Sequence, residues 1–334
     1  MALELITGAD DGGRRLDRIL RKALPELSLS ELYRLLRKGR ILVDGKAGRA
    51  DDRIAPGARI QLPPNIGRSY PSGPYQKRPL PAGAAPLPAL DILWEGAGLL
   101  FLNKAPGLLV HGPGDLKSLE TQVLHYLRGK LPPSLSFKPG PLHRLDRPTS
   151  GIVAFSTGLE GARNFSALLR QGKIKKQYLA LVEGEVGEEE VWENWLFRDR
   201  EQKKTFSTGN PGEKAQRALT RVWKLISGSG YTLVRLEIAT GRTHQIRAQA
   251  ALHGYPLAGD RKYGGGLRKG HDSLEPSGSR EPQIFLHAAT LEFLGEGMAD
   301  VPKIIKAPLP EAFLQRIHEL FGDKFAKILD PPSL

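Results

Sequence analysis

The sequence predicts an α+β protein: a mixed, largely antiparallel β-sheet with flanking helices, preceded by a small separate domain. Stretches that read as strands are more numerous than helices after residue 89, so a strict alternation of strand and helix is not expected. A run dominated by proline, glycine, serine and alanine at 63–88 is typical of a semi-extended linker. The predicted domains therefore cover residues 1–62 and 89–334.

The first domain is short and basic. Its first helix has apolar residues at helical spacing, namely Leu16, Ile19, Leu20 and Leu24. A second helix should begin after Ser28, which forms a capping-box pattern with Glu31, and should end at Gly39. Residues 41–46 read as a strand that enters an Asp-Gly turn, and residues 59–62 read as a closing strand.

The second domain should contain most of the strands. They are expected at 99–103, 151–156, 177–183, 219–226, 231–239 and 285–293. Helices are expected at 119–129, 159–171, 243–253 and 310–321. In the strand at 231–239, alternate residues share a face, which indicates that one side packs against a core. Residues 264–282 are rich in glycine, serine and charge, as in a surface insertion.

Composition narrows the classes of function. The 334 residues carry a formal net charge of +13, which indicates a polyanionic partner, although a generically basic enzyme is the alternative. The absence of cysteine excludes disulfides, thiolate catalysis and cysteine-ligated zinc. Phosphate-loop, dinucleotide and metal-ligand spacings are missing, so we expect no metal and no cofactor. Because the sequence contains no signal peptide and no apolar run of membrane length, we expect a cytoplasmic protein. We also expect a monomer.

The segment 143–151 is the densest in chemistry. It places Asp146 between Arg144 and Arg147, just before an apolar strand, and so on a loop at the sheet edge. The neighbouring cations should lower the pKa of Asp146, and an ionised carboxylate can act as a nucleophile or a base. The alternative is a structural salt bridge that fixes the loop, with Thr149 and Ser150 as local caps.

Five motifs in one order resemble a known family. His-Arg-Leu-Asp-Arg-Pro-Thr-Ser-Gly at 143–151 resembles the signature of the RluA/RluC/RluD pseudouridine synthases. The other four motifs follow in family order: Lys-Lys-Gln-Tyr-Leu-Ala-Leu-Val-Glu-Gly at 175–184, Gly-Arg-Thr-His-Gln-Ile-Arg at 241–247, Gly-Asp-Arg-Lys-Tyr-Gly at 259–264 and Phe-Leu-His-Ala at 285–288. Residues 14–62 resemble the small αL-type RNA-binding module first described in a ribosomal small-subunit protein.

The resemblance implies a reaction and three catalytic residues. The N-glycosidic bond of a uridine in RNA is broken and the base is rejoined through C5, without a cofactor. Asp146 would attack the sugar or remove a ribose proton to give a glycal. Tyr178 would stack on the flipped base and transfer a proton, rather than serve as a core tyrosine. Arg247 would pair with Asp146, rather than be a surface arginine, and Arg242 is the runner-up for that pairing or else a phosphate contact.

RNA contacts are expected from both domains. Arg144 matches the family residue that helps to displace the target nucleotide. The first domain should bind phosphates through Arg34, Arg37, Lys38 and Arg40, unless these only form a solvated helix face. Three histidines are expected to make structural hydrogen bonds: His143, His244 and His287.

The substrate is expected to be large-subunit (23S-type) ribosomal RNA. Leu-Tyr-Arg-Leu-Leu-Arg-Lys-Gly at 32–39 resembles the members that modify it, and a transfer RNA is the close alternative. Pro148 and Ala248-Gln249 depart from the family pattern and put the substrate in doubt more than the reaction. Rival functions are a non-catalytic RNA-binding or ribosome-assembly factor and a carboxylate-dependent hydrolase of a small anionic metabolite.

Overall fold

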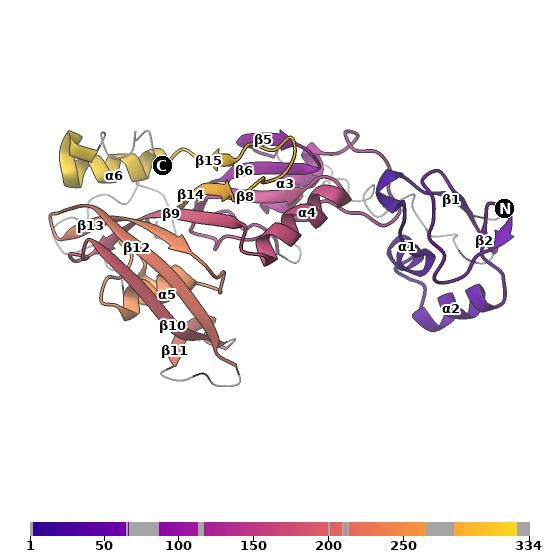
Figure 1. Ribbon diagram of the computed structural model, residues 1–334, viewed down its shortest axis with the longest axis horizontal. Coiled ribbons are helices and arrows are strands. Elements are labelled where there is room, and N and C mark those ends of the chain that lie inside the picture. Colours follow the sequence, from indigo (N-terminus) through magenta and orange to yellow (C-terminus); the bar gives the residue numbers. More distant parts are fainter. Residues whose placement is uncertain are drawn as a thin grey trace.

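The chain folds into two β-sheets at different positions along an elongated molecule (Figure 1). The computed structural model describes residues 3–64, 66, 87–112, 117–199, 201–208, 211, 214–264 and 284–325. Most of the expected linker at 63–88, and all but the first residue of the expected insertion at 264–282, lie outside the described residues. Among the described residues, no helix combines the length and apolar character needed to cross a membrane.

The N-terminal sheet has the strand order β1-β4-β2-β3. Its region contains β1 (Leu3–Ile6), η1 (Ala9–Asp11), α1 (Leu16–Ala23), α2 (Leu29–Arg37), β2 (Leu42–Val43), β3 (Lys46–Ala47) and β4 (Arg59–Leu62). The Ser28 side chain accepts a hydrogen bond from the backbone N–H of Glu31 at 3.3 Å, as the capping pattern predicts. The leucines of α1 lie in the apolar core between the helices and this sheet.

The second sheet runs β11-β10-β12-β13-β9-β14-β8-β6-β5, with β15 paired to β14 and β7 paired to β8. Its strands are β5 (Ile92–Gly96), β6 (Leu99–Lys104), β7 (Gly140–Pro141), β8 (Ser150–Ser156), β9 (Ile174–Glu183), β10 (Glu189–Asp199), β11 (Lys204–Thr208), β12 (Gln216–Gly228), β13 (Tyr231–Ile238), β14 (Leu286–Phe293) and β15 (Ile304–Lys306). Among these described strands only β14 and β8 pair in parallel. The predicted α+β class with a largely antiparallel sheet is therefore confirmed.

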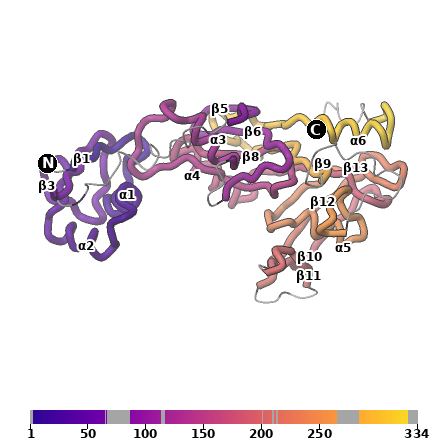
Figure 2. The backbone as a smooth tube through the Cα atoms, turned by 180° about the vertical axis from the view of Figure 1, so that it is seen from behind, coloured from indigo at the N-terminus to yellow at the C-terminus, as the bar shows by residue number. Residues whose placement is uncertain are grey.

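Helices cover both faces of this sheet. On one face, α3 (Leu119–Tyr126) and α5 (Gln245–Leu252) contribute to a core with β6, β8, β9, β12 and β13. On the other face, α4 (Leu159–Arg170) packs near β6, β8 and β14, and α6 (Glu311–Phe321) packs near β9 and β13. Seen from behind, the hairpin of β10 and β11 projects beyond the helices (Figure 2). Two short 3-10 helices complete the fold, η2 (Arg261–Tyr263) and η4 (Gly322–Phe325).

The predicted helix at 243–253 begins two residues later than expected. His244 precedes α5 in the left-handed region, with φ 54° and ψ 27°, so the regular helix can begin only at Gln245. Seven of the described strands were not predicted: β1, β3, β5, β7, β10, β11 and β15.

Gly151 allows the one parallel pairing in the described sheet. Its φ is +106°, and a Cβ atom there would lie 2.2 Å from the Ala288 carbonyl oxygen across the β8–β14 pair. Only glycine fits so close to a neighbouring backbone. Beside it, the Ser150 hydroxyl donates to His287 Nδ1 at 2.9 Å, and His287 Nε2 donates to the Ala307 carbonyl at 3.2 Å. His287 is thus a structural residue, as expected.

A buried carboxylate lies at the centre of the contact between the N-terminal domain and the second domain. Asp11 is 0% exposed and accepts hydrogen bonds from Leu135 N at 2.8 Å, Ser136 N at 2.9 Å and Ser134 Oγ at 2.9 Å. It also accepts from Ser136 Oγ and from Gly8 N. Asp10 Oδ1, which accepts from Leu159 N at 2.8 Å, and Arg14 Nη1, which donates to the Ser136 carbonyl at 3.2 Å, also bond across this contact. Leu135 itself is buried in the N-terminal core. A carboxylate held by this many donors fixes the contact between the domains.

We therefore expect Asp11→Ala to lower the free energy of unfolding by about 2–5 kcal/mol, because it leaves several buried donors unpaired. Urea unfolding would measure the loss. Asp51→Ala removes an equal charge from an exposed position and is the matched control. Equal unfolding midpoints for the two variants would contradict this account of the contact.

Candidate active site

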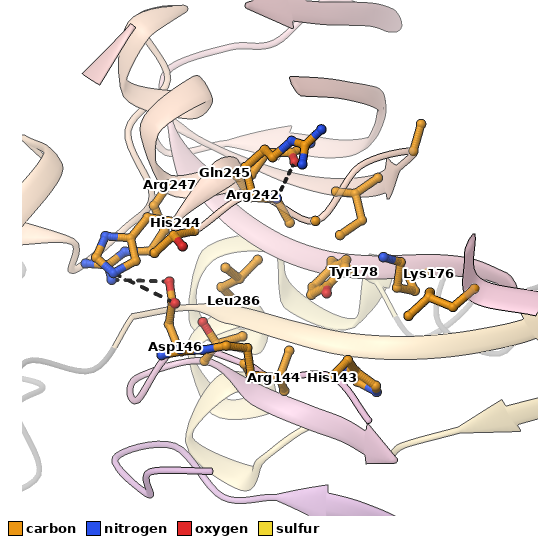
Figure 3. Close-up of a pocket in the computed structure, with 18 residues that line it drawn as sticks. His143, Arg144, Asp146, Lys176, Tyr178, Arg242, His244, Gln245, Arg247 and Leu286 are labelled. Carbon is orange, nitrogen blue, oxygen red and sulfur yellow. Dashed lines mark hydrogen bonds and ion pairs between the residues drawn. The ribbon is translucent and has the colours of Figure 1, made fainter. Parts of the chain in front are cut away.

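A cleft of about 410 Å³ opens on the face of the sheet that carries α5 (Figure 3). Most of its lining comes from three segments: the loop before β8, the strand β9, and the turn that leads into α5. The cleft brings together five of the residues selected from sequence: Asp146, Tyr178, Arg247, Arg144 and Arg242. Residues far apart in the chain thus meet at one site.

Asp146 lies at the cleft wall with 16% of its side chain exposed. Its Oδ2 is 3.5 Å from Arg247 Nη1, and its Oδ1 is 3.8 Å from His244 Nε2. Burial raises the pKa of Asp146, although the charges of Arg247 and Arg144 act in the opposite direction. The neighbouring cations thus act in the expected direction, but the expected net lowering of this pKa is wrong, because burial outweighs them and the sequence does not reveal how deeply the carboxyl is desolvated.

Arg247 has a closer partner than Asp146. Its Nε and Nη2 donate to the two oxygens of Asp260 at 2.7 and 2.8 Å, a bidentate pair in which Asp260 is 0% exposed. Burial acts to lower the pKa of Arg247, but its bonds and proximity to Asp260 raise it. Asp260 thereby keeps the guanidinium charged and fixed, with Nη1 directed toward Asp146.

Tyr178 lies on β9, with Lys176 on the same strand and also lining the cleft. It is 8% exposed, and burial together with the charge of Asp146 raises its pKa. The phenol therefore stays protonated and can donate a hydrogen bond. Burial lowers the pKa of Lys176, so its ammonium group loses a proton more readily than that of an exposed lysine.

Lys104 supports the Asp146 loop and was not selected from sequence. It ends β6, is 1% exposed, and donates from Nζ to the carbonyls of Ala105 and Leu108 at 2.9 Å and of Arg147 at 3.1 Å. Burial lowers its pKa to about 7, and the charge of Asp146 opposes that shift. The sequence feature that could have identified it is a lysine at the end of an apolar strand. A cation buried at such a position needs specific hydrogen-bond acceptors.

The remaining selected residues have local or exposed positions. His143 Nε2 accepts from Ala154 N at 3.1 Å, which agrees with the expected loop-fixing role. Arg242 Nε donates to the Arg217 carbonyl at 3.1 Å, and the structure gives it no ion pair with Asp146 among the described contacts. Arg144 is exposed at the cleft. Four basic residues of the N-terminal domain are exposed: Arg34, Arg37, Lys38 and Arg40. Helix α2, which carries the first two, lies at the other end of the molecule from α5 (Figure 1).

The part of the chain that the structure describes holds no group of three or more histidine, aspartate or glutamate side chains placed to bind a metal ion.

Two family models match the chain. Residues 98–252 match the RNA pseudouridylate synthase family, and residues 14–60 match the S4 domain. The first match contains Asp146, Tyr178 and Arg247, and the second contains all of α1 and α2.

Relatives are similar over nearly their whole length. The chain is 31% identical over 323 residues to ribosomal large subunit pseudouridine synthase C of Salmonella typhi, covering 95% of each chain. It is 31% identical over 319 residues to the protein of the same name from Escherichia coli K12, covering 93% of this chain and 94% of the other. The Vibrio cholerae protein is 32% identical over 313 residues, covering 92% and 93%.

Two solved structures share the fold. Human RNA pseudouridylate synthase domain containing 4 aligns with a TM-score of 0.54 at 24% identity, over 69% of this chain and 93% of that one. Human RNA pseudouridylate synthase domain containing 1 gives 0.52 at 24% identity, over 69% and 86%.

The Lys104 contacts lead to a prediction. Lys104→Met should lower the free energy of unfolding by about 3 kcal/mol, because it removes the donor for three backbone carbonyls under the Asp146 loop. Urea unfolding would measure this, with the exposed Lys303→Met as control. A Lys104→Met protein as stable as the control would show that these carbonyls do not need the ammonium group.

Proposed function

Because the chain belongs to the RNA pseudouridylate synthase family, we propose that it isomerises uridine to pseudouridine in large-subunit ribosomal RNA, with Asp146, Tyr178 and Arg247 as catalytic residues. The names of its relatives, which are large-subunit enzymes, support this choice of RNA over transfer RNA. Action in the cytoplasm and as a monomer stay predictions.

One observation carries the residue assignment: three motifs separated in sequence supply a carboxylate, a phenol and a guanidinium to the same cleft. Asp146 and Arg247 both line the cleft, with Arg247 Nη1 3.5 Å from Asp146 Oδ2. A structural salt bridge alone would not need a cleft in front of the carboxylate. The bidentate partner of Arg247 is Asp260, so the pairing with Asp146 is not required to neutralise the arginine.

The chemistry follows from these positions. If Asp146 attacks C1′, the C1′–N1 bond breaks and its electron pair leaves with the uracil ring. In the other route, Asp146 removes the C2′ proton to give a glycal and later returns it. The uracil then turns and its C5 bonds to C1′. In the first route the Asp146–C1′ ester bond breaks as this bond forms, and in the second the proton returns to C2′. The C5 proton is lost to solvent, and N1 takes up a proton. Tyr178 offers an aromatic face and a phenol proton beside the ring.

Entry of the nucleotide is supported by the charge around the cleft. Arg144 and Arg242 line the cleft, and a planar cation at such a position can hold phosphates or fill the stack that a flipped base leaves. The exposed cations of the N-terminal domain would add affinity that does not depend on RNA sequence.

Asp146→Asn should reduce the reaction at least about a thousandfold, because the amide keeps the shape but is neither nucleophile nor base. The measurement is release of tritium from uridine C5, with large-subunit ribosomal RNA and transfer RNA compared as substrates. Filter binding of the same RNA should be close to wild type, so that loss of rate is not loss of binding.

Each outcome of this assay decides a different point. No release by the wild type from any cellular RNA would favour a non-catalytic RNA-binding or assembly factor. Release that persists in Asp146→Asn would overturn the assignment of that residue. Free uracil as the product would indicate a hydrolase, and release from transfer RNA alone would replace the proposed substrate.

Arg37→Ala combined with Lys38→Ala should weaken RNA binding and make it less dependent on salt. The slope of the logarithm of the binding constant against the logarithm of the salt concentration should become shallower by about 0.7–0.9 for each lost phosphate contact. The rate at saturating RNA should not change, because both side chains are exposed on the N-terminal domain. Substitution is preferable to removal of the domain, which would strip Asp11 from its donors in the second domain. The exposed Lys303→Ala and Lys306→Ala pair is the control, and an unchanged slope in the α2 variant would contradict phosphate contact there.

A further inference from the structure

His244 occupies an unusual position next to the proposed catalytic carboxylate. It precedes α5 in the left-handed conformation, with φ 54°, a geometry that glycine and asparagine adopt more readily. Histidine is among the residues enriched in this region, so the backbone tolerates an imidazole here but does not by itself require one. The side chain is 13% exposed and lies between Asp146 and Tyr263, with Nε2 3.8 Å from Asp146 Oδ1 and Nδ1 2.8 Å from Tyr263 Oη.

The contacts of the ring determine which nitrogen carries the proton. The backbone N–H of Thr205 donates to Tyr263 Oη at 2.7 Å, so the hydroxyl proton of Tyr263 is available to donate to His244 Nδ1. Arg198 Nη1, which can only donate, is 3.5 Å from the same Nδ1. Since Nδ1 accepts from both sides, the proton of the neutral imidazole is on Nε2, the atom that faces Asp146.

The surroundings also keep the ring neutral. Burial lowers the pKa of His244 to about 3, and nearby cations add to this effect while Asp260 opposes it. The charged and titratable groups that face the ring come from β10, η2, α5 and the loops beside them: Arg198, Lys262, Tyr263, Arg247, Asp260 and Asp146. A neutral N–H can stabilise a carboxylate without exchanging a proton with it.

We propose that His244 is a positioning residue whose Nε2–H donates to the Asp146 carboxylate during the reaction, and that the Tyr263 hydroxyl fixes the tautomer this requires. The inference rests on the proposed function of the cleft and adds two residues to it. The 3.8 Å separation is longer than a hydrogen bond, but such contacts commonly shorten when substrate closes a site. Arg247 would then hold Oδ2 while His244 holds Oδ1.

The donor has a definite electrostatic task. Burial raises the pKa of Asp146 and so favours its inactive, protonated form at mildly acid pH. A hydrogen bond to the carboxylate favours the ionised form and opposes this rise. Removing the donor should therefore raise the pKa of Asp146 further, and the activity should be lost at a higher pH when the solution is acidified.

The test uses His244→Asn and Tyr263→Phe in the full-length chain. Asparagine suits the left-handed backbone but is too short to replace the imidazole Nε2, and phenylalanine keeps the ring whose centre is 5.1 Å from the Arg247 guanidinium. Single-turnover tritium release should fall by about ten- to a hundredfold in His244→Asn, as expected for one hydrogen bond to a charged group. In Tyr263→Phe the same rate should fall by about tenfold, because without the hydroxyl the proton of the His244 ring can move to Nδ1.

The pH profile separates positioning from a structural role. In both variants the acid limb of the single-turnover rate should move to higher pH than in the wild type. Rates within twofold of wild type, or an equal loss at every pH with the limb unmoved, would overturn the proposal. If His244→Asn does not fold, Tyr263→Phe alone decides the question in the same way.

His253→Asn is the matched control. His253 follows the other end of α5, stacks on Trp192 and also has a pKa lowered by burial, but it lies outside the cleft lining. In this variant the acid limb of the pH profile should lie at the same pH as in the wild type. A wild-type protein that releases no tritium would refute the proposed function itself, whereas active wild type with unmoved limbs in both variants would refute only the role of His244 and Tyr263.

Discussion

The site depends on one buried cation. The guanidinium of Arg247 is almost excluded from water, and a charge in that position is stable only beside a counter-charge with well-aligned hydrogen bonds. Asp260 supplies both, through two bonds of 2.7 and 2.8 Å. The guanidinium is thereby fixed with one nitrogen turned toward Asp146, which does not itself have to neutralise it. Asp260 thus both neutralises and orients the guanidinium, and Asp146 is needed for neither.

The fold was largely predictable because its elements follow local rules. Alternating or continuous apolar residues identified six strands of the large sheet, and a serine cap identified the start of α2. The misses have physical reasons. In β10 the exposed and buried residues do not alternate regularly, and several charged residues lie along it. The edge strand β1 is only four residues long, too short for periodicity to distinguish from a loop.

For the site, sequence reasoning selected side chains that the structure brings to one cleft, but it did so from ordered motifs rather than from chemistry. The motif at 259–264 contains Asp260 and Tyr263, but the sequence indicated no role for either residue. Their partners Arg247 and His244 come close to them only when the chain folds. His244 was expected to be structural because a lone histidine gives no sign of what faces each nitrogen. Burial also cannot be read from the loop sequence, which is why the direction of the Asp146 pKa was wrong.

The buried Asp11 contact gives the molecule a fixed internal spacing. A freely tethered N-terminal domain would offer its cations to any nearby phosphate, whereas a docked one offers them at a set distance and direction from the cleft. An RNA that spans both surfaces gains the second contact at high effective concentration, and an RNA of another shape gains only one. If the chain acts as proposed, this fixed contact between the domains would let the fold of an RNA, rather than its base sequence, contribute to which uridine is selected.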